Sequence, residues 1–86
     1  NKNGNAVDED TSPSNQQLLK NSVKDILRIE DFEHFKDFLR KEKNDGNISF
    51  EPSEIKAIKD ANDIDELPSL FCVTLLRLVK SKQKSN

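Results

Sequence analysis

The sequence predicts an all-α fold: a small bundle of four short helices, or five if a short extra turn is counted, between disordered ends. Three observations carry this prediction. Apolar residues recur at helical spacing in three separate segments. Capping residues, proline and glycine mark where those segments begin and end. A fourth segment, residues 70–79, is an apolar run in which leucines outnumber β-branched residues, which favours a buried helix over the competing buried strand.

Length and composition set the boundaries of the domain. The chain has 86 residues, 35% of them charged and 33% hydrophobic, so it holds one domain at most. Residues 1–13 are polar and acidic, and we expect a disordered linker or arm there, because so little apolar surface cannot offset the entropy of ordering. The helical domain then spans residues 14–80, and residues 81–86 form a basic C-terminal tail.

The first two helices have clear start signals. Ser14, followed three positions later by Gln17, makes a capping box for a helix over residues 14–28. Asp31 is the expected cap of the second helix, which ends near Gly46 because glycine tolerates positive φ. The apolar sides of the two helices are formed by Leu19, Val23, Ile26 and Leu27, and by Phe32, Phe35, Phe38 and Leu39.

The third helix begins near Pro52, since proline suits the first turn of a helix, and residues 60–63 end it. Residues 47–50 before it form a short extended link whose two apolar side chains are expected to reach the core. Asp63 and Glu66 can cap a turn that leads into the last helix.

The last helix is apolar on nearly every side, since only Thr74 and Arg77 interrupt residues 70–79. Such a helix is buried on more than one face, and three short helices have little area to cover it. Small domains without a disulfide or a metal often gain stability by self-association. We expect one stripe to face the core and another a partner chain; the alternative is a central helix wholly buried in a monomer. The expected interface residues are Phe71, Cys72, Leu75, Leu76, Leu78 and Val79.

These features predict a non-catalytic module for protein–protein interaction and self-association, as a dimer or tetramer, in a larger intracellular protein. Its expected partners are a copy of itself and another intracellular protein. The chain begins with Asn and shows no secretory signal, and its single Cys suits a reducing compartment. No membrane partner is expected, because no apolar stretch approaches ~18 residues.

Charge is distributed unevenly along the chain. Residues 16–66 carry nine basic and thirteen acidic side chains, whereas residues 67–86 carry four basic side chains and no acid. An acidic body is a poor phosphate-binding surface, which disfavours nucleic acid as a partner. The alternative function is a small helical nucleic-acid-binding module that uses Arg77, Lys80, Lys82 and Lys84. The other interpretation of this tail is a solubilising C-terminus.

No metal or cofactor site is expected. Residues 44–51 look like the middle of an EF-hand calcium loop, but the first, third and twelfth positions would be Lys41, Lys43 and Pro52. Calcium needs carboxylates at those positions. The acidic cluster at residues 60–66 is better explained as helix caps and a solvated turn than as a site for a divalent ion.

Catalysis has no signature either. His34 stands without a second His or a nearby acid–base constellation, and a position at the edge of the core is expected for it. The apolar neighbours of Cys72 predict a buried and inert thiol rather than a nucleophile.

The segment DIDELPSLFCVTLLRLVKSKQKSN, residues 63–86, resembles the end of a small nuclear adaptor domain. With the polar linker before it, the chain resembles the C-terminal tetramerisation domain of budding-yeast telomere-length regulators that interact with the telomeric repressor/activator protein. That resemblance implies a nuclear helical module that tetramerises and helps to cross-link partner proteins on telomeric chromatin. The size also fits sterile-alpha-motif and PWI-type bundles, although the Pro-Trp-Ile signature of the latter is missing.

Overall fold

The computed structural model describes residues 13–83. Over this range, the chain forms α-helices and no strand, so the prediction of a small all-α bundle of four helices is confirmed. The expected disordered arm was residues 1–13, of which residues 1–12 lie outside the described range, as do the last three residues of the basic tail. The four helices are α2 (Asn15–Ser22), α3 (Phe32–Asn44), α4 (Pro52–Asp60) and α5 (Ser69–Lys80).

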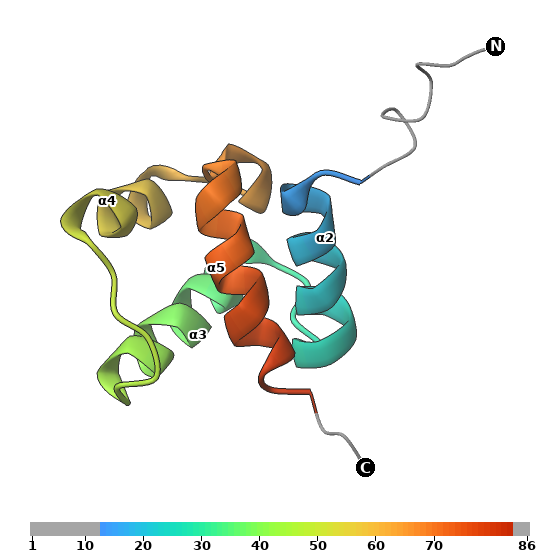
Figure 1. Ribbon diagram of the computed structural model, residues 1–86, viewed down its shortest axis with the longest axis horizontal. Helices are drawn as coiled ribbons and strands as arrows, with labels where there is room; N and C mark the ends of the chain where they lie inside the picture. The colour runs from blue at the N-terminus through green and yellow to red at the C-terminus, as the bar shows by residue number, and fades with distance from the viewer. Residues whose placement is uncertain (1–12, 84–86) are drawn as a thin grey trace, which may run out of the picture.

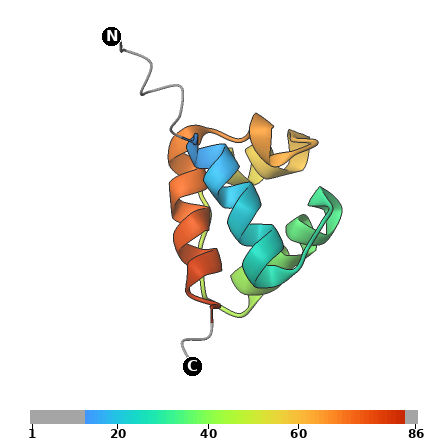
Figure 2. The same cartoon turned by 90° about the vertical axis from the view of Figure 1, so that its right-hand side faces the viewer.

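Helix α5 lies at the centre of the arrangement. It runs between α2 on one side and α3 and α4 on the other (Figure 1). Helices α2 and α5 lie side by side and run in the same direction (Figure 2). Their first turns are joined by a 2.8 Å hydrogen bond from Asn15 Nδ2 to Ser69 Oγ. Gln16 Nε2 adds a second contact by donating to the carbonyl of Leu67 at 3.0 Å.

Helix α2 begins where its cap was predicted. The Ser14 hydroxyl accepts a hydrogen bond from the backbone N–H of Gln17 at 3.0 Å, which satisfies one of the unpaired donors of the first turn. Only this half of the capping box forms, because the side chain of Gln17 donates to Asn21 at 3.0 Å instead of returning to the cap.

The end of this first helical segment differs from the predicted continuous helix over residues 14–28. A π-helical turn, Val23–Leu27, follows α2. Its extra residue lets Ile26 and Leu27 both pack against the core, although neither is fully buried. Arg28 ends the turn in the left-handed conformation, with φ 61°. Its N–H bonds to the carbonyl of Lys24 at 3.2 Å.

The predicted cap of α3 is also present, and α4 begins at Pro52 as expected, with a cap that was not predicted. The Asp31 side chain accepts from the backbone N–H of His34 at 2.9 Å. Glu51 and Glu54 form a reciprocal capping box ahead of α4, with a 2.8 Å bond from the Glu51 N–H to the Glu54 carboxylate. Gly46, with φ 83°, lies just after the end of α3, as its conformational freedom predicts.

The core is formed where α5 meets the other elements, and α2 and the 3-10 turn Ile64–Glu66 contribute strongly to it. Phe35 of α3 is fully buried and stacks on Phe38 with ring centroids 5.9 Å apart. Phe50 of the extended link packs edge-on against Phe71, at 5.7 Å between centroids. The fully buried side chains are Leu19, Phe35, Leu39, Leu67, Cys72, Leu75 and Val79. Among the described helices, none has the length and apolarity needed to cross a bilayer.

Candidate interface on helix α5

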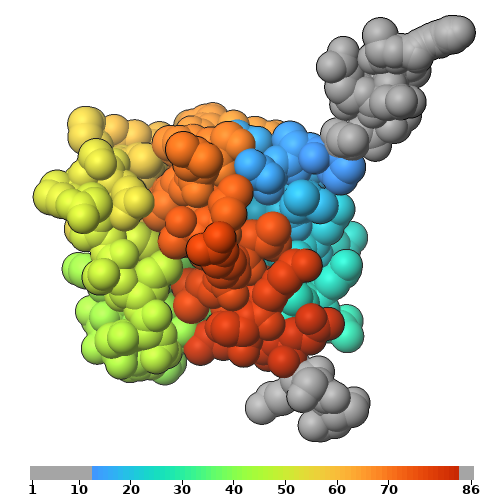
Figure 3. Space-filling view, viewed as in Figure 1, coloured from blue at the N-terminus to red at the C-terminus, as the bar shows by residue number. Residues whose placement is uncertain are grey.

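The apolar run of α5 is largely buried, but one side of the helix faces solvent. This outer side forms the middle of the surface shown in Figure 3, between the other helices. Leu70, near its N-terminal end, is 82% exposed, the largest exposure of any large apolar side chain in residues 13–83. Val73, one turn further on, is half-buried. Thr74 and Arg77 on the same side are exposed.

The expected division of α5 into a core stripe and a partner stripe is not what the structure shows. The stripe of Phe71, Leu75 and Leu78 is buried, and so are Cys72 and Val79 of the second stripe. Burial within one chain leaves these five residues almost no surface to offer a partner. The sixth expected interface residue, which is half-buried and packs against the core, is Leu76.

Leu70 and Val73 are therefore candidate interface residues that the sequence-based assignment missed. The sequence does identify them through Thr74 and Arg77, the two polar residues of the apolar run. Leu70 precedes Thr74 by four positions and Val73 precedes Arg77 by four, so each lies one turn from a polar residue on the same side. The polar residues of an otherwise apolar helix mark its solvent side, and in α5 the residues four positions before them share it.

Helix α2 carries a further exposed apolar side chain. Leu18 is 37% exposed and lies one turn after Asn15. Val73 lies one turn after Ser69. Because Asn15 and Ser69 are hydrogen-bonded and the two helices run in parallel, we expect Leu18 and Val73 to follow the same side of the helix pair. We call the surface formed by Leu18, Leu70, Val73 and Leu76 the α2–α5 patch.

The basic residues of the tail do not form one free cluster. Lys82 Nζ forms a 2.6 Å ion pair with Glu42 near the end of α3. Arg77 and Lys80 are exposed, and neither has an ion-pair partner within residues 13–83. Lys84 lies outside the described residues. Lys82, one of the four candidate nucleic-acid contacts, is thus paired within the protein and links the end of α5 to α3.

Glu42 is the one buried charged residue of the described chain. Its side chain is 7% exposed, and it accepts hydrogen bonds from Lys82 and, at 2.9 Å, from Asn47 Nδ2. The bond from Lys82 lowers the pKa of this carboxyl, and Asn47 adds to the effect against the opposing influence of burial. The carboxylate therefore stays ionised and links the C-terminal ends of two helices.

Cys72 lies fully buried in the core, as predicted. Burial raises the pKa of its thiol from 9.0 to about 11. A thiol with this pKa is almost wholly protonated at neutral pH, and the thiolate is the reactive form. The position suits an inert core residue.

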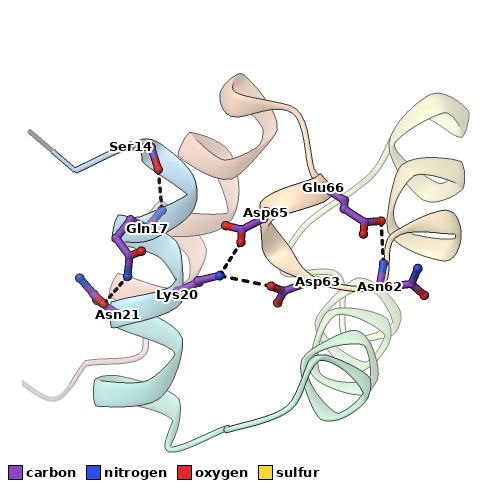
Figure 4. A network of polar contacts seen from close by, with 8 residues as sticks. All are labelled: Ser14, Gln17, Lys20, Asn21, Asn62, Asp63, Asp65 and Glu66. Carbon is purple, nitrogen blue, oxygen red and sulfur yellow. Dashed lines mark hydrogen bonds and ion pairs between the residues drawn. The ribbon is translucent and has the colours of Figure 1, made fainter. Parts of the chain in front are cut away.

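The acidic cluster forms a polar network that holds the 3-10 turn against α2 (Figure 4). Lys20 contacts Asp65 at 2.7 Å and Asp63 at 3.2 Å, and both carboxylates raise the pKa of its ammonium group. Glu66 accepts a hydrogen bond from the backbone N–H of Asn62 at 3.0 Å. Glu66 thus caps the turn as expected, but the side chain of Asp63 makes no capping hydrogen bond and pairs with Lys20 instead. Residues 13–83 contain no group of three His, Cys, Asp or Glu residues arranged to hold a metal ion.

The remaining candidates are exposed surface residues. His34 is exposed and its Nδ1 lies 2.8 Å from Asp31, so the expected position at the edge of the core is wrong and the residue lies on the surface. The segment that looks like a calcium loop begins inside α3, because Lys41 is part of that helix and pairs with Asp45 at 2.8 Å.

Comparison with known proteins gives no further constraint, since no family model, no curated protein and no solved structure matches this chain. The class of protein is therefore defined by the fold itself, a small helical bundle.

Proposed function

We propose that this chain is a non-catalytic module for protein–protein interaction that associates with copies of itself through the α2–α5 patch. The observation that carries the proposal is the 82% exposure of Leu70 on the central helix of a small domain. Leu70, with Val73 three positions after it and Leu18 on the parallel helix, offers an apolar surface that a second helix can cover. In keeping with its resemblance to telomere-length regulators, we place this module in a nuclear protein that links partners on telomeric chromatin.

The size of the patch predicts weak association. Covering Leu70 in both subunits of a symmetric dimer contributes roughly 2.5–5 kcal/mol, given its 82% exposure and about 1.5–3 kcal/mol for a whole leucine. Association itself costs at least about 4 kcal/mol in lost translational and rotational freedom. By the same arithmetic Leu18, which is 37% exposed, contributes about 1–2 kcal/mol and the half-buried Val73 and Leu76 together about 1–3 kcal/mol, so the net gain reaches about 6 kcal/mol at its upper limit. We therefore expect a dissociation constant on the order of 100 µM for the isolated module, as in transient complexes.

Sedimentation equilibrium over a range from about 10 µM to about 1 mM tests the proposal, because it brackets the expected dissociation constant. The mass of the wild-type chain is expected to rise with concentration, and that of Leu70→Glu to stay at the monomer value. Leu70→Glu is a better test than Leu76→Glu, since Leu76 packs against the core and its replacement threatens folding. Leu70 is a surface position, where substitutions change stability by about 0.5 kcal/mol or less.

Ile55→Glu supplies a matched control, because Ile55 is also an exposed apolar residue but lies on α4. This variant is expected to associate as the wild-type chain does, and circular dichroism confirms that both variants are folded. A wild-type chain that remains monomeric at the highest concentration would refute self-association. Equal association of wild type and Leu70→Glu would refute the assignment of the patch.

A further inference from the structure

A groove of about 330 Å³, open to solvent, lies between α3 and α4. Its apolar lining consists of Leu39, Phe50, Ile55 and Ile58. Ile55 is 39% exposed, and α4 contains no fully buried residue. The apolar side of α4 is therefore only partly covered by the rest of the chain. The groove lies on different helices from the α2–α5 patch.

The remaining lining residues make this groove basic. Lys36, Arg40 and Lys43 of α3 and Lys59 of α4 stand against a single acid, Glu33. The lining thus carries three net positive charges in a chain whose formal net charge is −2. Positive charge is concentrated here although the body of the protein is acidic.

Part of this charge has no partner within the described residues. Lys36 Nζ lies 3.7 Å from the Glu33 carboxylate, and the Arg40 guanidinium lies 2.7 Å from the Asp37 carboxylate. Both pairs lie within α3. Lys43 and Lys59 have no ion-pair partner in residues 13–83. These two lysines, one on each helix, are available to an anionic partner.

The spacing of the basic residues matches a helical ligand. Lys36, Arg40 and Lys43 follow one another at four and three positions, so they lie along one side of α3 over about 10 Å. A second helix that carries carboxylates four and three positions apart could place one carboxylate against each of these basic residues. Apolar residues on the adjoining side of that helix would meet Ile55 and Ile58.

We propose that this groove binds an acidic amphipathic helix of a partner protein. Its apolar side packs on the groove lining, and its carboxylates contact the basic residues of α3 and α4. A nucleic acid would satisfy the charges but leave the apolar lining uncovered. Phe50 offers no stacking platform, because its ring packs edge-on against Phe71. This binding does not depend on self-association through the α2–α5 patch.

A designed peptide provides the probe. It has about sixteen residues, with leucines at helical i, i+3 or i+4, and i+7 spacing and glutamates beside them. A second peptide carries Lys in place of every Glu. Fluorescence anisotropy with each labelled peptide measures its dissociation constant for the whole chain. We expect the acidic peptide to bind at least about tenfold more tightly than the basic one, and more weakly as salt is raised.

Charge-reversal variants locate the binding. Lys43→Glu combined with Lys59→Glu should weaken the acidic peptide at least about fivefold, because two favourable pairs become two repulsive ones. Lys24→Glu combined with Lys80→Glu is the matched control, since both lysines are exposed, neither lines the groove, and the pair changes the net charge by the same amount. It should change the dissociation constant less than about twofold.

Three results would overturn the proposal. The first is equal binding of the acidic and basic peptides, or no binding of either. The second is equal loss of affinity in the double control variant and in the double groove variant, which would indicate a general charge effect. The third is binding to phosphatidylserine vesicles without binding to the acidic peptide, which would assign the groove to lipid. The mass measurement on Leu70→Glu is independent of all three.

Discussion

The contact between Glu42 and Lys82 gives the sharpest prediction about stability. Replacing Lys82 by Met removes the ammonium group, keeps much of the side-chain volume, and leaves Glu42 with Asn47 as its hydrogen-bond donor. Glu42 is in the last turn of α3, where the helix dipole disfavours an anion, so the lysine also offsets an unfavourable position.

The magnitude lies between two limits. Exposed ion pairs contribute about 0.2–1 kcal/mol, and removing one partner of a buried pair costs about 3–5 kcal/mol. The Glu42 side chain is 7% exposed and that of Lys82 is 32% exposed, so we expect Lys82→Met to lower the free energy of unfolding by about 2 kcal/mol. For a domain of this size, the midpoint of thermal unfolding falls by about 10 °C.

The difference in free energy of unfolding between the wild type and Lys82→Met should disappear in acid. The folded-state pKa of Glu42 lies below its ordinary value of 4.5, mainly because Lys82 donates a hydrogen bond to the carboxylate. Stabilisation from this group is therefore complete above the ordinary pKa and is lost as pH falls through the folded pKa. Other carboxyls with lowered pKa, such as Asp31 and Asp60, lose their stabilisation equally in both proteins.

Urea denaturation followed by circular dichroism, at about pH 7 and about pH 3, measures both effects. Lys80→Met is the matched control, because Lys80 is exposed and its loss should cost less than about 0.5 kcal/mol. The reasoning fails if Lys82→Met matches the wild type at neutral pH. It also fails if the difference persists unchanged in acid.

Three further predictions concern single positions. Arg28→Gly should raise the free energy of unfolding by about 0.5–1 kcal/mol, because a left-handed arginine costs about 1–2 kcal/mol and a glycine loses more entropy on folding. An unchanged urea midpoint would contradict this. Ser14→Ala should lower the same quantity by about 1 kcal/mol through loss of the cap, and no loss would exclude a stabilising role for the cap. Cys72, whose pKa burial raises to about 11, should react with a disulfide reagent only as urea unfolds the chain; immediate reaction of the native protein would contradict its burial.

The helix starts could be predicted because the responsible interactions are local. Ser14, Asp31 and Pro52 each act within about one turn of their own position, and the structure uses each of them at the start of a helix. The π-helical turn after α2 could not be predicted in this way. Its two apolar side chains, Ile26 and Leu27, pack against the core, and this packing depends on the tertiary arrangement.

The sequence did not determine which side of α5 faces the core. A run that is apolar on nearly every side carries almost no periodic signal, so its neighbours decide which residues are buried. Helices α2 and α3 and the link at Phe50 cover more of α5 than the count of three short helices suggested. Most of the residues that were expected to contact a partner are therefore buried in the core. The apolar residues of α5 that face solvent are Leu70 and Val73 instead.

The role of Lys82 was also hidden in the sequence. Lys82 follows Leu75 by seven positions and Leu78 by four, so it continues the buried side of α5 beyond the end of the helix. Its partner, Glu42, is 40 positions away and has no distinctive neighbours. A pair of opposite charges so far apart in sequence becomes recognisable only when the fold brings the two helix ends together.

The two proposed surfaces should act independently, and this can be tested. The α2–α5 patch and the α3–α4 groove share no residue, and no network of polar contacts joins them in residues 13–83. Coupling between sites is a free energy that acts equally in both directions. Leu70→Glu should therefore abolish self-association while changing the affinity for the acidic peptide less than about twofold, and Lys43→Glu with Lys59→Glu should do the reverse. Such a chain could hold two different partners at once. Reciprocal loss of both activities in each variant would show instead that the surfaces are linked, and a model of two separate contacts would have to be abandoned.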